Sequence, residues 1–158
     1  MKPGGGKAKG AQFERYICKR LSLFITEGKH EDVFWRSAMS GGRATIKAGV
    51  RQGGDITAVT VEGYDFCEDW NVECKHVKHL GLDSFIVRNT GPMAKYWQQT
   101  QRDAKKQDKT PMLICRQNGW PILVVVPRNR TSHFGDRIDV VAMTPKITIF
   151  NFDDWTRL

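Results

Sequence analysis

The sequence predicts an α/β fold in a single domain, because helix-like and strand-like segments alternate along its 158 residues. Two segments repeat apolar residues every three to four positions, which is the period of an amphipathic helix. Shorter apolar or alternating segments, with the length of strands, lie between and after them. Hydrophobic residues make up 40% of the chain, enough for a core in a domain of this size. We expect the domain to span residues 11–158, after a flexible basic arm at residues 1–10 that is rich in Gly and Lys.

The first half of the chain is expected to hold one helix and three strands. Residues 12–26 predict the helix, because apolar side chains follow one stripe and Gly28 comes after the last turn. Strands are expected where apolar residues cluster or alternate, at 32–37, 55–61 and 70–76. Residues 39–54 contain five glycines and predict a mobile loop or a distorted hairpin rather than a core element. Residues 62–69 predict a polar turn that joins the second and third strands as a hairpin.

The second half is expected to begin with a helix at 92–107, where Pro92 suits the first turn. Its packing face is expected to include Met93, Tyr96, Trp97 and Thr100. Strands at 112–116 and 121–126 flank Asn118-Gly119, a strong hairpin signal. Further short elements are expected near the end of the chain, as strands at 138–142 and 146–150 and a helical cap at 152–155.

The net charge of the chain indicates the class of molecule that it binds. The chain has 25 Lys and Arg residues against 17 Asp and Glu residues, a formal net charge of +8. A basic surface attracts nucleic acid at long range, but charge alone does not separate a nuclease from a passive binder. No stretch approaches the roughly 20 apolar residues that span a bilayer, and residues 1–10 do not form a signal peptide, so we expect a cytoplasmic protein without membrane contact. The four cysteines make no CxxC pair and predict buried, reduced thiols.

Two of the expected strands each carry an acidic residue in apolar surroundings. Asp55 follows two glycines, while Glu73 lies in the later strand with Lys75 two positions on. Alternate side chains of a strand share a face, so Glu73 and Lys75 point one way and Cys74 points the other. A hairpin would bring Asp55 beside them. Two carboxylates and an ammonium group would then converge on one spot.

Clustered carboxylates favour a cation, and Mg²⁺ prefers oxygen ligands. Asp55 and Glu73 would hold it, and the backbone carbonyl of Cys74 could add another oxygen. A bound metal polarises a phosphate and lowers the pKa of water. Lys75 could orient or deprotonate that water, or stabilise charge on the phosphate.

Asp55 followed by Glu73-x-Lys75 resembles the PD-(D/E)xK nuclease superfamily, with Gly54 in place of the usual proline. The order of helices and strands around these residues matches the αβββαβ core of that superfamily. The resemblance therefore implies a restriction-endonuclease-like fold, in which helices flank a central mixed β-sheet.

More closely, the chain is similar to Holliday junction resolvases of archaeal type, including versions carried by phages. Glu14-Arg15 matches a Glu-Arg pair on their early helix, and Arg36-Ser37-x-x-Ser40 matches their Arg-Ser-x-x-Ser stretch. The resemblance implies Glu14 as a further acid of the metal site, with Arg36 and Ser40 gripping the phosphate near the cut. The lysine usual on the second helix has several candidates, with a glutamine as the alternative: Lys95, Lys105, Lys106, and Gln98 or Gln99.

The implied function is a Mg²⁺-dependent endonuclease that resolves four-way DNA junctions by phosphodiester hydrolysis, with Mn²⁺ as a substitute and no small-molecule cofactor. Phosphate contacts are expected from Arg15, Arg36, Ser37, Arg43, Lys47, Arg51, Lys78, Lys95, Arg102, Lys105 and Lys106. The two-fold symmetry of a junction favours a homodimer, with Phe150, Phe152 and Trp155 as its candidate interface. All five tryptophans are expected in the core or an interface rather than as platforms for bases. The alternatives are a duplex endonuclease of repair or restriction type and a catalytically inactive nucleic-acid-binding module.

Overall fold

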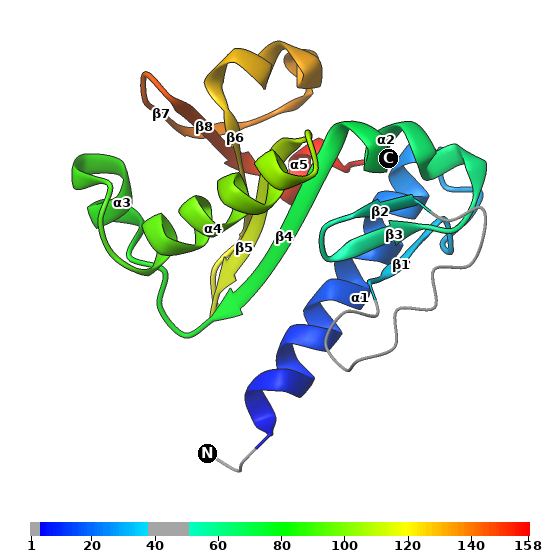
Figure 1. Ribbon diagram of the computed structural model, residues 1–158, viewed down its shortest axis with the longest axis horizontal. Helices are drawn as coiled ribbons and strands as arrows, with labels where there is room; N and C mark the ends of the chain where they lie inside the picture. Colours follow the sequence, from blue (N-terminus) through cyan, green and yellow to red (C-terminus); the bar gives the residue numbers. More distant parts are fainter. Residues whose placement is uncertain (1–3, 38–50) are drawn as a thin grey trace.

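The protein is built from two β-sheets that meet along one edge of a strand (Figure 1). The computed structural model describes residues 4–37 and 51–158, and only the backbone of Arg51. Three residues with expected roles, Ser40, Arg43 and Lys47, lie outside the described residues. Their roles stay predictions.

The larger sheet has five strands in the order β4-β5-β6-β8-β7. Its outer strand β4 runs parallel to β5, and the other pairs are antiparallel, so the sheet is mixed as expected. The strands are β4 (Trp70–Val77), β5 (Thr110–Gln117), β6 (Ile122–Pro127), β7 (Val140–Met143) and β8 (Ile147–Asn151). The strand predictions for this half of the chain are confirmed, with boundaries that differ by a few residues.

The smaller sheet contains β1 (Phe34–Arg36), β3 (Ile56–Ala58) and β2 (Arg51–Gly53), all antiparallel, with β3 in the centre. It lies beside the free edge of β4 (Figure 1). A parallel bridge between Gly54 and Val72 joins the sheets there, and it includes a 2.7 Å hydrogen bond from the Asp55 amide to the Val72 carbonyl.

The expected hairpin between the second and third strands is wrong. β3 pairs with β1 and β2, not with β4. The segment expected as a polar turn folds into a 3-10 turn, η1 (Val61–Gly63), and a short helix, α2 (Tyr64–Asp69). Burial of Cys67 stabilises this helix against the small sheet. Because the connection is a helix and not a tight turn, β4 can run parallel to the segment at Gly54.

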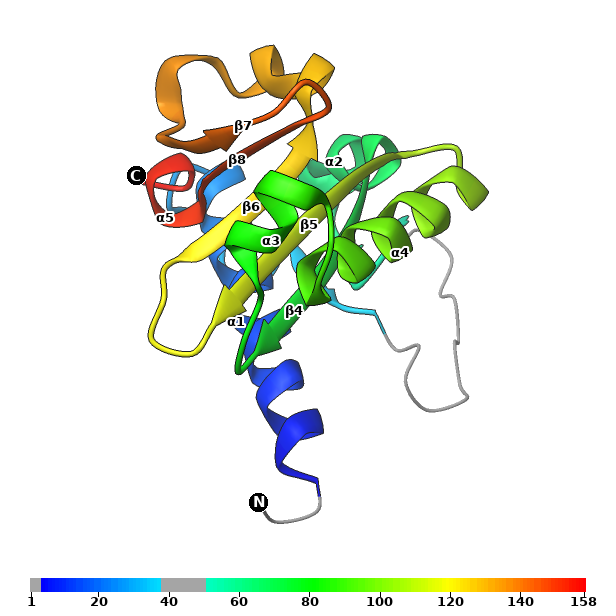
Figure 2. The same ribbon diagram turned by 90° about the vertical axis from the view of Figure 1, so that its left-hand side faces the viewer.

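Helices cover the two faces of the larger sheet (Figures 1 and 2). α1 (Gly5–Ile25) lies on one face, while α3 (Leu82–Arg88) and α4 (Pro92–Lys106) lie on the other. The remaining elements are the 3-10 segment η2 (Arg128–Arg137) and the expected terminal cap, α5 (Phe152–Trp155). No described helix is long and apolar enough to cross a membrane.

α1 begins earlier than expected. It includes residues 5–10, which the sequence assigned to a flexible arm. Once the amphipathic part has formed, adding a further turn fixes one residue per hydrogen bond, so even a glycine-rich segment can extend a helix. The extension projects beyond the sheet (Figure 1).

Alternating side chains of the central strands divide the core into two layers. Ile114 and Val124 face α1, whereas Leu113 and Val125 face α4. Phe150, Phe152 and Trp155, which were expected at a dimer interface, are buried in the α1 layer. They complete the core of one chain, so that placement of the interface is wrong.

The tryptophans divide into two groups. Trp70, Trp97 and Trp155 are buried, as expected. Trp35 and Trp120 are 60% and 39% exposed, so neither lies in the core, and an interface role for these two stays a prediction. The four cysteines are buried and free, as predicted.

Candidate active site

The backbone around Gly54 places Asp55 against β4. Gly54 has a φ of +80°, and a Cβ built on it would lie 2.2 Å from the Val72 carbonyl oxygen. A side chain at this position would therefore push the two sheets apart, which gives a physical reason for glycine where the superfamily usually has proline. The Asp55 carboxylate then reaches along the strand, where its Oδ2 accepts a 2.7 Å hydrogen bond from the amide of Cys74.

Glu73 and Lys75 lie on the same face of β4, as strand alternation predicted. That face is the one covered by α4. The Lys75 Nζ is 2.6 Å from the Glu73 Oε1, and Glu73 is 7% exposed. The same oxygen accepts a longer hydrogen bond of 3.5 Å from the Gln99 side chain. The Lys75 Nζ also lies 5.5 Å from the centre of the Tyr96 ring. These contacts from α4 hold the acid and the lysine together.

The charges and the burial of Asp55 and Glu73 at the edge of β4 favour the binding of a cation. Burial, with the nearby charge of Glu73, raises the pKa of Asp55 from 3.8 to about 7, although the Cys74 amide and Lys75 oppose the rise. Burial acts to lower the pKa of Lys75, but the hydrogen bond and charge of Glu73 outweigh it and raise that pKa overall. Lys75 therefore stays charged, and a second positive charge would relieve the cost of ionising Asp55 beside Glu73.

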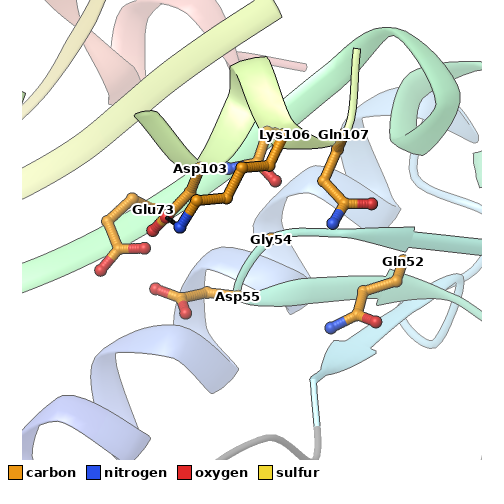
Figure 3. Close-up of a pocket in the computed structure, with 8 residues that line it drawn as sticks. Gln52, Gly54, Asp55, Glu73, Asp103, Lys106 and Gln107 are labelled. Atoms are coloured by element: carbon orange, nitrogen blue, oxygen red, sulfur yellow. Dashed lines mark hydrogen bonds and ion pairs between the residues drawn. The ribbon is translucent and has the colours of Figure 1, made fainter. Parts of the chain in front are cut away.

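Asp55 and Glu73 open into a hollow of about 330 Å³ between β4, the small sheet and α4. Figure 3 shows their carboxylates on the same side of the hollow, with the side chain of Lys106 extending toward Asp103 and Glu73. The Lys106 Nζ lies 3.5 Å from the Asp103 Oδ1. The full lining is Gln52, Gly54, Asp55, Asn71, Glu73, Asp103, Lys106 and Gln107.

Sequence reasoning missed four polar members of this lining, Gln52, Asn71, Asp103 and Gln107. Asp103 carried a usable signal, because it follows Gln99 by four positions and precedes Lys106 by three, which places them on neighbouring parts of one helix face. Of the three lysines considered for the second helix, Lys106 is the one that lines the hollow with Asp55 and Glu73.

Glu14 and Arg36 form a half-buried ion pair between α1 and β1, with 2.6 Å between the Glu14 Oε2 and the Arg36 Nε. Neither residue lines the 330 Å³ hollow. The charge of Glu14 still contributes to the raised pKa of Asp55, so the pair lies near the site. The structure thus brings together the two residues matched separately by the resemblance.

The other residues expected to contact phosphate are spread over several surfaces. Arg102 and Lys105 line a second hollow on α4, Arg15 and Arg36 line a third between α1 and β1, and the Ser37 hydroxyl is 2.8 Å from that of Thr57. Lys78 and Lys95 are exposed. The side chain of Arg51 is outside the described part of the chain.

A metal ion would find carboxylate oxygens here, although residues 4–37 and 51–158 contain no ready-made group of three or more His, Cys, Asp or Glu side chains. Within a strand, the N–H and C=O of one residue point to the same side. The amide of Cys74 faces Asp55, so its carbonyl also lies on this edge of β4. Hard oxygen donors from the carboxylates of this hollow fit Mg²⁺ or Mn²⁺.

A mixed sheet with flanking helices, in which an aspartate meets a Glu-x-Lys sequence at the outer strand, is the arrangement of PD-(D/E)xK nucleases. A sequence model of the family described as "Phage putative PDDEXK endonuclease" matches residues 5–157, so the chain belongs to that family. Searches of curated proteins and of solved structures gave no match. The family implies a nuclease that acts on DNA, and PD-(D/E)xK nucleases typically depend on a divalent metal.

Proposed function

We propose that the protein is a Mg²⁺-dependent endonuclease that hydrolyses phosphodiester bonds in branched DNA, with the four-way junction as its substrate. The observation that carries the proposal is the pairing of Asp55 and Glu73 at one hollow, beside the ammonium group of Lys75. Membership of the PDDEXK endonuclease family supports the reaction type.

In this proposal, the carboxylates of Asp55 and Glu73 hold Mg²⁺ together with the carbonyl of Cys74, and Mn²⁺ can replace it. The ion supplies a polarised phosphate and a water of lowered pKa. Lys75, fixed by Glu73 and Tyr96, orients the attacking water and stabilises charge on the phosphate oxygens.

The rim of the hollow binds the neighbouring DNA backbone. Lys106 is an exposed cation on the α4 side, and the net charge of +8 draws the duplex toward the protein. The Glu14–Arg36 pair adds to the site from α1 and β1, with Arg36 as a proposed contact to phosphate.

The four-way junction is supported by the resemblance of Glu14-Arg15 and of the stretch from Arg36 to junction resolvases. A junction has two-fold symmetry and must be cut at two points, so we propose a homodimer as the working unit.

The deciding experiment compares cleavage of a four-way junction with cleavage of a linear duplex that has the same sequence, in Mg²⁺ and in EDTA. We expect metal-dependent cleavage of the junction and at least tenfold slower cleavage of the duplex. Equal cleavage of both DNAs would replace the junction proposal with a duplex endonuclease. No metal-dependent cleavage of any DNA would instead favour an inactive nucleic-acid-binding module.

A further inference from the structure

Trp35 lies exposed beside the candidate active site, although tryptophan is a costly side chain to leave in water. It is 60% exposed, the largest exposed fraction among the five tryptophans, three of which are buried. Its neighbours on β1, Phe34 and Arg36, point inward, where Phe34 packs into the core and Arg36 pairs with Glu14. Trp35 therefore occupies the outer face of the small sheet.

Residues on that outer face connect Trp35 with the hollow that contains Asp55 and Glu73. In the strand register, Trp35 lies opposite Thr57, and Thr57 lies opposite Gln52 on its other side. Directly opposed residues of antiparallel strands share a face, so the three side chains form a row across the sheet. Gln52, at the far end of this row, lines the hollow that contains Asp55 and Glu73.

The hollow beside Trp35 is lined by one more cation than acid. Trp35 lines a hollow of about 370 Å³ between α1 and β1. Arg15, Lys19 and Arg36 bring positive charge to this hollow, and Glu31 and Asp32 are its acidic members. Lys19 pairs with Glu31 at 2.9 Å and Arg36 pairs with Glu14 at 2.6 Å, while Arg15 is exposed. An aromatic face with arginines beside it, close to a phosphate-cleaving site, suits a base and its backbone.

We propose that Trp35 is a stacking platform for an unpaired DNA base at the branch point, which makes it a specificity determinant for branched over linear DNA. This inference rests on the proposed function, because it assumes that the scissile phosphate lies at Asp55 and Glu73. Bases inside a duplex are already stacked on both faces, so a platform of this kind gains energy only from a base that has left the stack.

Binding can be measured without cleavage, with Ca²⁺ in place of Mg²⁺. The probe is a branched DNA that carries 2-aminopurine at an unpaired position, and the comparison is a linear duplex of the same sequence. We expect the wild-type protein and Trp35→Phe to quench the 2-aminopurine fluorescence, since both have a ring. Trp35→Leu removes the ring but keeps an apolar side chain, so it should lose the quenching and bind the branched DNA roughly 5- to 100-fold more weakly.

Two controls isolate the effect. Trp120→Leu alters the other exposed tryptophan, in the turn before β6, and should leave the quenching unchanged. Thermal unfolding should show Trp35→Leu folded as the wild type is, because the residue lies outside the core.

The inference is overturned if Trp35→Leu binds branched DNA as tightly as the wild type, or if its affinity for branched and linear DNA falls equally. A protein partner at this surface would give the first of these results. Failure of the proposed function would give a different result in the cleavage assay. The wild type would not cleave DNA in Mg²⁺, whether or not the 2-aminopurine fluorescence is quenched.

Discussion

The amide of Cys74 donates a hydrogen bond to the Asp55 carboxylate, so the backbone of β4 holds this side chain against the strand. The Asp55 amide in turn donates to the carbonyl of Val72, two residues earlier on the same strand. The acid is thus fixed at both its main chain and its side chain before any ligand arrives. Such preorganisation is what a site needs if it is to bind a small cation with defined geometry.

Neutralising either acid should abolish cleavage. Asp55→Asn and Glu73→Gln keep the size of each side chain but remove a charge, so we expect cleavage in Mg²⁺ to fall by about 10²–10³-fold or more. Binding of DNA in EDTA should change little. The matched control is Asp83→Asn, which alters an exposed aspartate in the first turn of α3. Wild-type cleavage by either active-site variant would show that the site is assigned incorrectly.

The raised pKa of Asp55 should make the metal-free protein less stable as pH rises. Its carboxyl holds a proton up to about pH 7 when folded, whereas the unfolded group loses it near 3.8. Between these values the folded protein binds more protons than the unfolded chain, so the free energy of unfolding falls with increasing pH. Asp55→Asn should remove this dependence. In EDTA the variant should match the wild type near pH 4 and exceed its stability by about 1–3 kcal/mol at pH 8.

Thermal or urea unfolding at the two pH values measures that difference, and an equal difference at both would refute the prediction. The same titration should appear in metal binding. Mg²⁺ requires the ionised carboxylate, so the affinity of the metal-free protein for Mg²⁺ should rise with pH and level off above about pH 7.

Gly54→Ala should reduce stability and cleavage far more than Gly119→Ala does, although both glycines have a similar positive φ. Gly54 and Gly119 both have positive φ, but a Cβ on Gly54 would lie 2.2 Å from the Val72 carbonyl, whereas one on Gly119 would meet nothing within 4 Å. We expect Gly119→Ala to cost about 1 kcal/mol of stability and to leave cleavage intact. Gly54→Ala should cost about 2–4 kcal/mol and reduce cleavage sharply. Equal effects on both properties would contradict this reading of the close approach.

Lys106 should matter more than its neighbour Lys105. Lys106 lines the hollow with Asp55 and Glu73, whereas Lys105 lines a separate hollow on α4. Lys106→Ala should therefore slow cleavage at low DNA concentration and reduce the slope of log affinity against log salt by about 1. Lys105→Ala, which removes the same charge from the next position, should have the smaller effect on cleavage. The reverse order would place the DNA on the other surface of α4.

Local signals decided the parts of the fold that were predicted well. The periodicity of residues 92–107 predicted α4 almost to its ends, and Asn118-Gly119 located the turn between β5 and β6. The partner of β3 was not available from local signals. It depends on whether residues 61–69 form a turn or a helix, and packing of this segment against β2, β3 and β4 with Cys67 buried favours the helix.

The residues of the candidate site were likewise predictable only where local sequence signals identify them. Asp55, Glu73 and Lys75 stood out because their spacing is short and their chemistry is unusual in strands. Asp103 enters the hollow only because α4 packs against β4, which is a tertiary contact. The exposure of Trp35 was not predictable for a related reason: two large apolar residues are adjacent at 34–35, and packing against α1 favours Phe34 as the inward one.

The bridge between Gly54 and Val72 has a mechanical consequence, because the two acids approach it from different sheets. Asp55 belongs to the small sheet side and Glu73 to the large one. A cation held by both carboxylates would act as a crosslink across this seam. It would add to the backbone hydrogen bonds and the shared hydrophobic core that already join the two sheets. Slower amide hydrogen exchange should spread outward from residues 54–56 when the ion binds.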